Sequence, residues 1–479
     1  MSPGTDRRWL ALIILCLGTL MIVLDATIVN VALPSIREDL GFSETSLAWV
    51  VNAYLLTFGG FLLLGGRLGD LFGHRKLFLI GIALFTVASL ACGIANSQET
   101  LVAARAVQGL GGAIVSAVAL SLIMTLFTET GERAKAMGVY GFVASGGGTL
   151  GVLAGGILTD ALDWHWIFLV NLPIGIAVYA LTVRLLKSEP GPAEGGRVDI
   201  AGAVTVTASL MLAVYAIVNG NEAGWLSVQT LGLLGAAAVL MVVFLVIEAR
   251  VSAPLMPLGL FRHRNISTAN AVGVLLAGSM FAWFFLSALY LQLVLGYSPL
   301  QVGLAFLPST LIMGGFSLGL SAKLVMRFGV RPPLVAGMLF MAAGLLLFAR
   351  VPVDGNFVLD VVPGSILLGI GAGMSFNPLL LAAMGDVEPT EAGLASGVVN
   401  TAFMMGGALG LAVLASLAAS RTDSLGDSGD DPLTALTGGY HAAFLVGAVF
   451  AVAGAAIGGA FLRAGAPAEM HAEPEAVPS

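Results

Sequence analysis

The chain has 479 residues, of which 58% are hydrophobic and only 10% are charged. Soluble domains carry about 25% charged residues, so the composition excludes an ordinary soluble globular protein. The net charge of -7 argues against a nucleic-acid-binding protein. Two cysteines, both within apolar runs, indicate neither a disulfide framework nor a thiolate metal site. Together these features are typical of a polytopic membrane protein.

The apolar residues gather into long unbroken runs, which predict membrane-spanning helices of about 20 residues each. A membrane β-barrel would show short alternating segments instead. We therefore expect an all-α protein with 14 transmembrane helices, with approximate cores at residues 10–31, 47–66, 77–96, 101–126, 136–159, 166–183, 200–219, 225–247, 268–292, 300–322, 332–349, 361–385, 393–418 and 441–462.

The first run follows Arg7 and Arg8 and could be confused with a signal peptide. It is too long for the apolar part of such a peptide and contains Asp25, so we expect it to be retained as a helix. With the N-terminus inside the cell, only Arg37, Arg350 and Arg421 fall in outer loops, and Arg105 falls within a span. The rest of the 21 Lys and Arg residues then lie in cytoplasmic segments. This bias predicts cytoplasmic N- and C-termini.

The chain resembles itself at an offset of 256 to 260 residues. Phe72-Gly73-His74-Arg75 recurs as Phe328-Gly329-Val330-Arg331, and Gly109-Leu110-Gly111 recurs as Gly369-Ile370-Gly371. The ordered set predicts two parallel six-helix bundles, a plan in which the substrate cavity lies between the halves. We expect an N-terminal bundle at 1–190, two inserted helices with their linkers at 191–264, a C-terminal bundle at 265–463 and a disordered tail at 464–479.

Several motifs resemble those of the fourteen-helix drug:proton antiporters of the major facilitator superfamily. They are Leu24-Asp25-Ala26-Thr27-Ile28-Val29-Asn30 in the first span, Gly66-Arg67-Leu68-Gly69-Asp70 through Lys76 after the second, Arg105-Ala106-Val107-Gln108-Gly109 in the fourth, and Trp164-His165-Trp166 through Gly175 at the sixth. The resemblance implies efflux of drugs or antibiotics across the cell membrane, driven by the proton gradient and without a cofactor or metal.

Asp25 is the only acidic residue well inside a span. At a rise of 1.5 Å per residue, Asp25 and Arg105 reach about the same depth in the outer half of the membrane. Asn52 and Gln108 lie near that level. Burial favours a neutral carboxylic acid and a nearby arginine favours a carboxylate, so we expect Asp25 and Arg105 to handle the coupling proton. A static ion pair that fixes helix packing is the alternative.

The loop after the second span combines glycines for a tight turn with charged residues. We expect a conformational latch here, in which Asp70 meets a helix N-terminus and a cytoplasmic arginine. The alternative is a simple turn with positive-inside charge. The residues assigned to the latch are Gly66, Asp70, Gly73, Arg75, Lys76 and Arg133.

Small residues let helices approach closely in lipid, and the fifth span carries the packing candidates Gly147, Gly148, Gly151 and Gly155. Aromatic and polar side chains in other spans are candidates for the substrate cavity, although each could instead face lipid or pack against a neighbour. These candidates are Asn30, Trp49, Asn52, Tyr54, Gln108, Trp283, Tyr290, Gln292, Asn377, Asn400 and Phe403.

We expect a carrier rather than an enzyme, since there is no catalytic or metal-ligand cluster and no Walker-type nucleotide motif. The expected partners are a small amphipathic substrate, protons and the lipid bilayer, with a monomer as the functional unit. A proton-coupled uptake carrier and a membrane sensor without transport remain as alternatives. The two inserted helices show no obvious polar face, and we expect them to pack on the lipid side.

Overall fold

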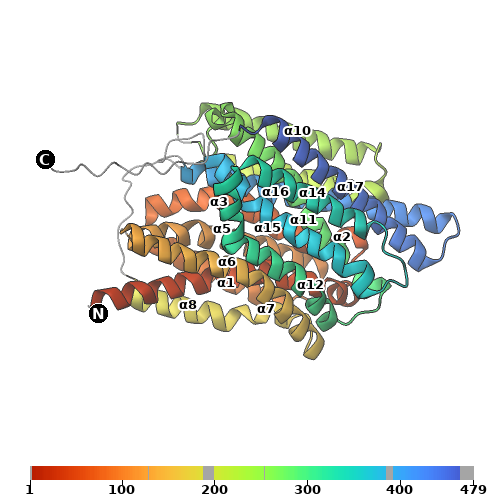
Figure 1. The fold of residues 1–479 in the computed structure, drawn as a ribbon, viewed down its shortest axis with the longest axis horizontal. Coiled ribbons are helices and arrows are strands. Elements are labelled where there is room, and N and C mark those ends of the chain that lie inside the picture. The colour runs from red at the N-terminus through yellow and green to blue at the C-terminus, as the bar shows by residue number, and fades with distance from the viewer. Residues whose placement is uncertain (1–2, 128, 187–198, 253, 385–391, 464–479) are drawn as a thin grey trace.

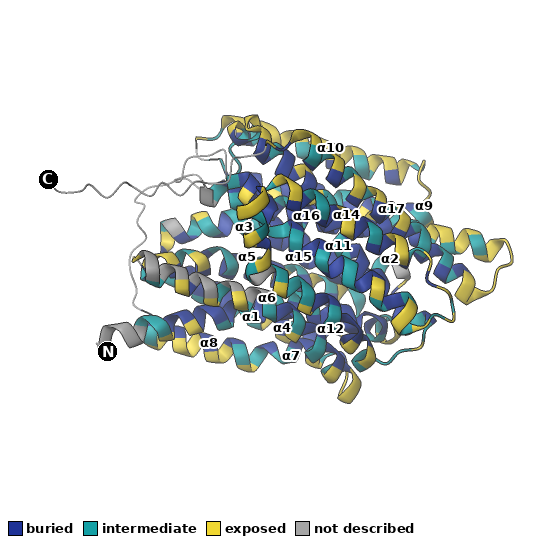
Figure 2. Cartoon of the chain, viewed as in Figure 1, coloured by how far each residue is buried: buried dark blue, intermediate teal, exposed yellow. Residues whose placement is uncertain are grey.

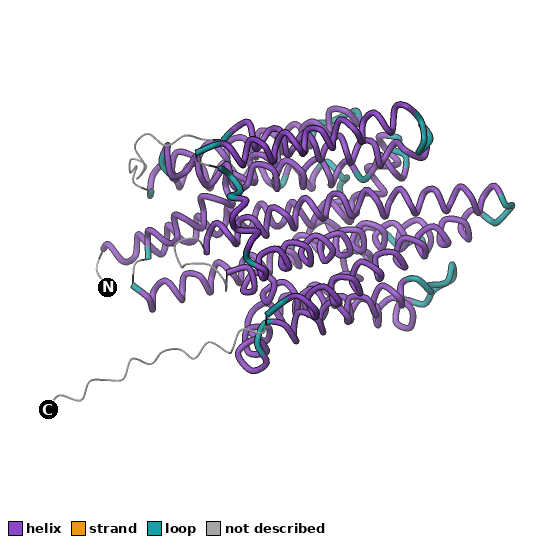
Figure 3. The backbone as a smooth tube through the Cα atoms, turned by 90° about the horizontal axis from the view of Figure 1, so that it is seen from above, coloured by secondary structure: helices purple, strands orange, loops and turns teal. Residues whose placement is uncertain are grey.

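The computed structural model describes residues 3–127, 129–186, 199–252, 254–384 and 392–463. The predicted disordered tail therefore lies outside the described residues. Within these ranges every regular element is a helix, and the helices run roughly parallel to one long axis (Figures 1 and 3). We call the end of the bundle where α1 begins, at the left of Figure 1, the near end, and the opposite end the far end.

The elements follow the predicted runs closely. In chain order they are α1 (Pro3–Leu40), α2 (Glu44–Leu47), α3 (Trp49–Phe72), α4 (His74–Gly93), α5 (Gln98–Leu126), α6 (Thr130–Ala161), α7 (Trp166–Leu169), α8 (Asn171–Leu185), α9 (Ile200–Ala223), α10 (Val228–Arg250), η1 (Leu258–Arg262), α11 (Arg264–Leu289), η2 (Tyr290–Val294), α12 (Pro299–Gly315), η3 (Phe316–Leu320), α13 (Ser321–Phe328), α14 (Arg331–Phe348), η4 (Phe357–Val361), α15 (Val362–Met384), α16 (Ala392–Asp427) and α17 (Pro432–Phe461).

Among the described residues, 12 spans are long and apolar enough to cross a membrane. The remaining two long helices, α6 and the 17-residue α12, are not among them, so length and composition do not establish the predicted count of 14. Buried side chains fill the middle of the bundle, while α10 turns apolar residues such as Val239 and Val242 outward, as a lipid-facing helix does (Figure 2).

Polar side chains define where several helices start. Ser97 caps α5, Ser227 caps α10, and Ser298 forms a capping box with Gln301 at the start of α12. Each supplies an oxygen to a backbone N–H group that the helix itself leaves unbonded. Gly73, between α3 and α4, and Gly329, between α13 and α14, have φ values of 91° and 78°. Only glycine adopts these easily, so both tight turns depend on it.

Equivalent helix crossings recur in the two parts of the chain. The position that a Cβ would occupy on Gly111 of α5 lies 2.7 Å from the backbone nitrogen of Phe85 on α4. The corresponding position on Gly371 of α15 lies 2.7 Å from the backbone nitrogen of Met341 on α14. The chains approach closely only because both residues lack a side chain. The crossing of α4 with α5 thus has a counterpart in the crossing of α14 with α15.

The helices α9 and α10 form a hairpin that packs against α3 and α16. Asn221 at the end of α9 donates to the backbone oxygen of Ser416 on α16 at 2.7 Å, and the Ser416 hydroxyl donates to that of Ile217 at 3.2 Å. The hairpin therefore forms hydrogen bonds with α16 in addition to facing the outside. The sequence predicted only the packing on the lipid side.

Candidate functional site

A buried ion pair lies in the middle of α1. Asp25 has no exposed surface, and its Oδ2 accepts a hydrogen bond from Arg105 Nη1 at 2.6 Å. Its Oδ1 accepts hydrogen bonds from Gln108 Nε2 at 2.7 Å and from Asn171 Nδ2 at 3.0 Å. Both carboxyl oxygens are thus bonded by side chains from α5 and α8, which satisfies a charge that burial would otherwise make very unfavourable.

Arg105 is held on several sides at once. Its Nε donates to the backbone oxygen of Val50 on α3 at 2.9 Å, and its Nη1 also donates to Gln108 Oε1 at 2.7 Å. The guanidinium lies 4.4 Å from the centre of the Tyr54 ring and 5.6 Å from that of Phe168. Since an aromatic face attracts a cation, these rings further stabilise the buried charge.

The network reaches α4 through Ser89 and Cys92. Gln108 Nε2 donates to Ser89 Oγ at 2.7 Å, and the Cys92 thiol donates to Gln108 Oε1 at 3.6 Å. The side chain of Gln108 therefore contacts three polar groups besides Arg105. The cluster joins α1, α3, α4, α5 and α8 around one arginine and one carboxyl group.

The bonding pattern suits an ionised Asp25. Every neighbour donates to its oxygens, so a proton added to Oδ1 would face the amide groups of Gln108 and Asn171, which are themselves donors. Loading a proton on Oδ1 would therefore require one of these amides to turn or to move away. This connects the protonation state of Asp25 to side chains of α5 and α8.

Sequence reasoning predicted that Asp25, Arg105 and Gln108 come together, and the structure brings them together. Asn52, predicted at the same level, is fully buried on α3, but neither atom of its amide has a hydrogen-bond partner in the described part of the chain. Asn171 and Ser89 were not predicted. Asn171 lies within the motif that resembles the sixth span of the family, which is a usable signal; Ser89 has none.

The expected latch is only partly visible. Gly73 forms the tight turn, and Arg75 Nη2 donates to the backbone oxygen of Val183 at the end of α8, at 3.0 Å. Gly66 lies within α3 and Lys76 is exposed. The side chains of Asp70 and Arg133 lie outside the described part of the structure, so the latch pairing stays a prediction.

Three of the packing glycines lie against α1. Cβ positions built on Gly147, Gly151 and Gly155 would meet Val23, Leu24 and Ile28 of α1, respectively, whereas that of Gly148 comes no closer than 3.9 Å to Thr27. The first three therefore permit the close approach of α6 to α1 beside Asp25, and Gly148 does not contribute to it.

The candidates for the substrate cavity are dispersed. Trp283 and Tyr290 are buried among helices that follow residue 263, where Tyr290 Oη donates to Pro352 O at 2.7 Å. The Trp49 ring lies 6.4 Å from that of Tyr215 on α9. Phe403 packs between Phe281 and Phe376 on its own side of the bundle.

The remaining polar candidates for the cavity form hydrogen bonds in different parts of the bundle. The amides of Asn30 and Asn400 donate to backbone oxygens of their own helices, whereas Gln292 Nε2 donates across to Val31 O on α1 at 2.8 Å. Asn377 is half-buried on α15. Their assignment to one cavity stays a prediction.

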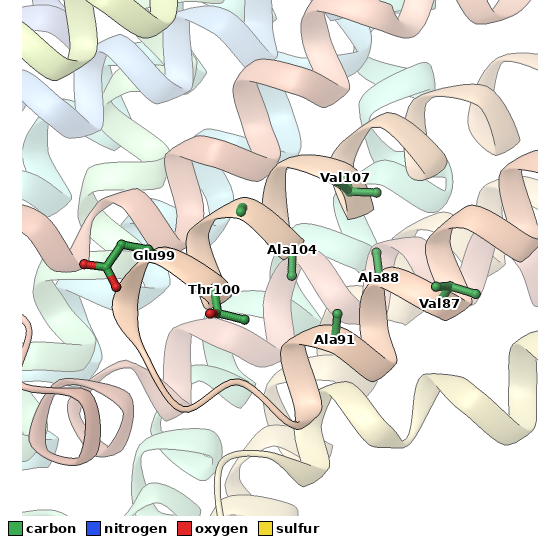
Figure 4. Close-up of a pocket in the computed structure, with 8 residues that line it drawn as sticks. Val87, Ala88, Ala91, Glu99, Thr100, Ala104 and Val107 are labelled. Atoms are coloured by element: carbon green, nitrogen blue, oxygen red, sulfur yellow. The ribbon is translucent and has the colours of Figure 1, made fainter.

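On the surface of the described residues, two shallow grooves do not include the ion pair among their lining residues. One runs between α4 and α5 and is lined mainly by small apolar side chains, including Ala88, Ala91 and Ala104 (Figure 4). The other lies at the far end, between Pro34 and Arg37 of α1 and Gln292 of η2. Neither includes Asp25 among its lining residues.

Comparisons with known proteins give the family. The sequence profile of the Major Facilitator Superfamily matches residues 15–411. The puromycin resistance protein pur8 of Streptomyces alboniger is 41% identical, over 94% of this chain and 90% of that protein. The cephamycin export protein CmcT of Amycolatopsis lactamdurans is 39% identical, over 99% of this chain and 97% of that one.

Solved structures agree on the fold. A bacterial homologue of the human lysosomal transporter Spinster, inward-facing and unoccupied, superposes with a TM-score of 0.67 at 15% identity. The superposition covers 96% of this chain and 97% of that one. The helical bundle, the extent of the profile match and the near full-length relatives lead to one conclusion: the chain belongs to the Major Facilitator Superfamily.

Proposed function

We propose that the chain exports drugs or antibiotics across the cell membrane in exchange for protons, by alternating access. Its relatives bear the names of puromycin resistance, lincomycin resistance and cephamycin export proteins and match at near full length. The observation that carries proton coupling is the fully buried Asp25, bonded by Arg105, Gln108 and Asn171. Ionisable groups at membrane depth usually serve transport or proton relay.

For the membrane arrangement we propose fourteen crossings, namely the 12 long apolar spans together with α6 and α12. The near end is then cytoplasmic, and both termini lie there. The lopsided distribution of Lys and Arg supports this orientation. The six crossings that end with α8 form one half, α11 to α17 form the other, and the α9–α10 hairpin is an insert between them.

The coupling step follows from the bonding of Asp25. Its carboxylate is matched to three donors, and a proton would displace the amides of Gln108 and Asn171. Arg105 is simultaneously bonded to Val50 of α3, which packs against α16 in the other half. Protonation of Asp25 thereby acts on the helix that contacts the opposite half, and release of the proton restores the bonded state.

The test uses proteoliposomes that contain a pH-sensitive dye and are supplied with puromycin, the compound in a relative's name. We expect wild-type protein to move protons opposite to the drug, and Asp25→Asn to abolish this proton movement. Asp423→Asn, on the exposed last part of α16, is the matched control and should behave as wild type.

Each alternative predicts a different result. Proton movement in the same direction as the drug would identify an uptake carrier, and no movement of either would exclude transport of this drug. Undiminished exchange in Asp25→Asn would remove Asp25 from the coupling mechanism while leaving the export function intact.

A further inference from the structure

A second pair of buried carboxyl groups lies in the inserted hairpin, far along the chain from Asp25. Asp199 immediately precedes α9, and Glu248 is in the last turn of α10, so the two residues lie at the near end of the hairpin. Their exposed fractions are 4% and 3%. Acidic side chains are almost never buried to this extent without a partner.

Each carboxyl group uses one oxygen for a backbone donor. Asp199 Oδ1 accepts from the N–H of Gly202 at 2.7 Å and so caps α9. Glu248 Oε2 accepts from the N–H of Met256 at 3.0 Å, in the linker that follows α10. The second oxygens, Asp199 Oδ2 and Glu248 Oε1, are buried and receive no hydrogen bond from any described donor.

These two unbonded oxygens both lie beside Gly202. A Cβ built on Gly202 would lie 2.5 Å from Asp199 Oδ2 and 2.8 Å from Glu248 Oε1. The space that a side chain would fill at Gly202 is thus taken by the two carboxyl groups, which face each other. Two carboxylates this close and away from water repel strongly, and one shared proton would satisfy both oxygens.

We infer that Asp199 and Glu248 form a proton-binding site at the cytoplasmic end of the inserted hairpin. The cytoplasmic placement rests on the proposed orientation. A metal ion fits less well, because Ca²⁺ needs about six to eight oxygen ligands and only two oxygens are free here. No cluster of three or more metal-ligand side chains occurs in the described residues.

No described cation neutralises the pair. Among the described residues, the charged or titratable side chains near this end of the neighbouring elements are Arg67 of α3, Arg250 of α10, Arg262 of η1 and His263, and all four are exposed. Arg197, two residues before Asp199, lies outside the described part. None forms an ion pair with either acid among the described residues. The side chain of Asp70 on α3 lies outside the described part.

The proton would hold the linker in place. Glu248 bonds Met256, and the adjacent Leu255 packs in a buried cluster with Leu64 of α3 and Ala203 of α9. Further along, Leu260 packs with Ala395 and Val398 of α16. The linker thus lies against helices of both proposed halves. When the proton is lost, repulsion between the two carboxylates would push the start of α9 away from the end of α10. The linker that follows α10 would then be released.

The proton itself can be observed by infrared spectroscopy of the purified full-length protein in lipid nanodiscs. We expect a protonated carboxyl stretching band that disappears in Glu248→Gln and that shifts in D₂O. Glu222→Gln, at the exposed opposite end of α9, is the matched control and should keep the band. A band equally present in wild type and in Glu248→Gln would overturn the assignment.

Hydrogen exchange tests the consequence for the linker. The glutamine amide in Glu248→Gln can donate to Asp199 Oδ2 permanently, so this variant imitates the protonated pair. At alkaline pH we expect linker residues 254–262 to exchange at least about tenfold faster in wild type than in the variant, corresponding to about 1.4 kcal/mol. At acidic pH the two should match.

Equal linker exchange in both proteins at alkaline pH would refute the proposed role of the proton. Asp199→Asn provides a second variant, with the same expected protection, should Glu248→Gln fold poorly. Because neither readout requires drug transport, failure of this inference is distinguishable from failure of the proposed export function, which the Asp25→Asn experiment tests.

Discussion

Arg105 bonds groups from three helices through one rigid guanidinium. Its Nε reaches the backbone oxygen of Val50, and its Nη1 reaches both Asp25 and Gln108. A lysine carries a single nitrogen on a flexible stem and cannot occupy the Nε and Nη1 positions together. The geometry therefore requires arginine itself, and not merely a positive charge, at this position.

We predict that Arg105→Lys lowers drug efflux at least about tenfold, because one lost hydrogen bond to a buried charge is worth about 1.5–3 kcal/mol. Transport in proteoliposomes, normalised to the amount of folded protein, measures the effect. The exposed Arg350→Lys is the control and should transport normally. Full activity in Arg105→Lys would mean that the bond to Val50 is dispensable.

Sequence reasoning found Asp25, Arg105 and Gln108 of the cluster but missed Asn171 and Ser89. Asp25 and Arg105 are conspicuous because charges are rare in apolar spans, and helix rise places them at one depth. Ser89 gives no such signal, because a serine in an apolar run can face its own backbone as readily as a neighbour. Asp199 and Glu248 escaped notice because acids next to spans are normally solvated, and their pairing depends on how α9 and α10 fold together.

At the scale of elements, close helix crossings depend on individual glycines. The Cβ position of Gly151 on α6 lies 2.8 Å from the backbone oxygen of Leu24, one residue before Asp25. Gly146, five positions earlier on the same helix, has nothing within 4 Å of its Cβ position. One helix thus offers both a tightly packed glycine and a matched free one.

We predict that Gly151→Ala destabilises the protein by about 1–3 kcal/mol, the usual penalty for overpacking a filled interface. Gly146→Ala should leave stability unchanged or raise it by up to about 1 kcal/mol, since alanine is the better helix former. Thermal unfolding of the two purified variants in the same detergent measures both. Equal midpoints would show that α6 and α1 can separate without loss.

One pair of equivalent helix crossings supports the predicted repeat, whose division into two bundles stays a prediction. Ordered glycines at a fixed offset were the signal, and the crossings at Gly111 and Gly371 show why those glycines occur: each removes a side chain where two backbones meet. The helix count was less secure. Helix α12 has only 17 residues before it continues as η3, and such an interruption is not apparent in an apolar run.

At the scale of the whole molecule, the two proposed halves contact each other where α6 meets α12 and where α3 meets α16. Toward the far end, the Cβ position of Gly156 lies 2.8 Å from Pro299 O, and that of Gly303 lies 2.9 Å from Val152 O. At the other junction, the Cβ position of Gly397 on α16 meets the side chain of Leu63 on α3. A sequence cannot reveal which of these contacts is closed at a given moment, because the proposed alternating access requires the same residues to meet and part.

Close contact between Gly156 and Gly303 makes closure of the far end sensitive to a single methyl group. We predict that Gly303→Ala shifts the population toward a conformation open at that end, because the added carbon would press on the α6 backbone. Gly314→Ala is the control, because the Cβ position of Gly314 on the same helix has no atom within 4 Å.

Maleimide labelling of a Ser35→Cys variant, in the far-end groove, reports the opening. Both native cysteines are buried. We expect faster labelling and slower efflux in Gly303→Ala than in Gly314→Ala. Identical labelling in the two backgrounds would show that α6 and α12 do not control access from this side.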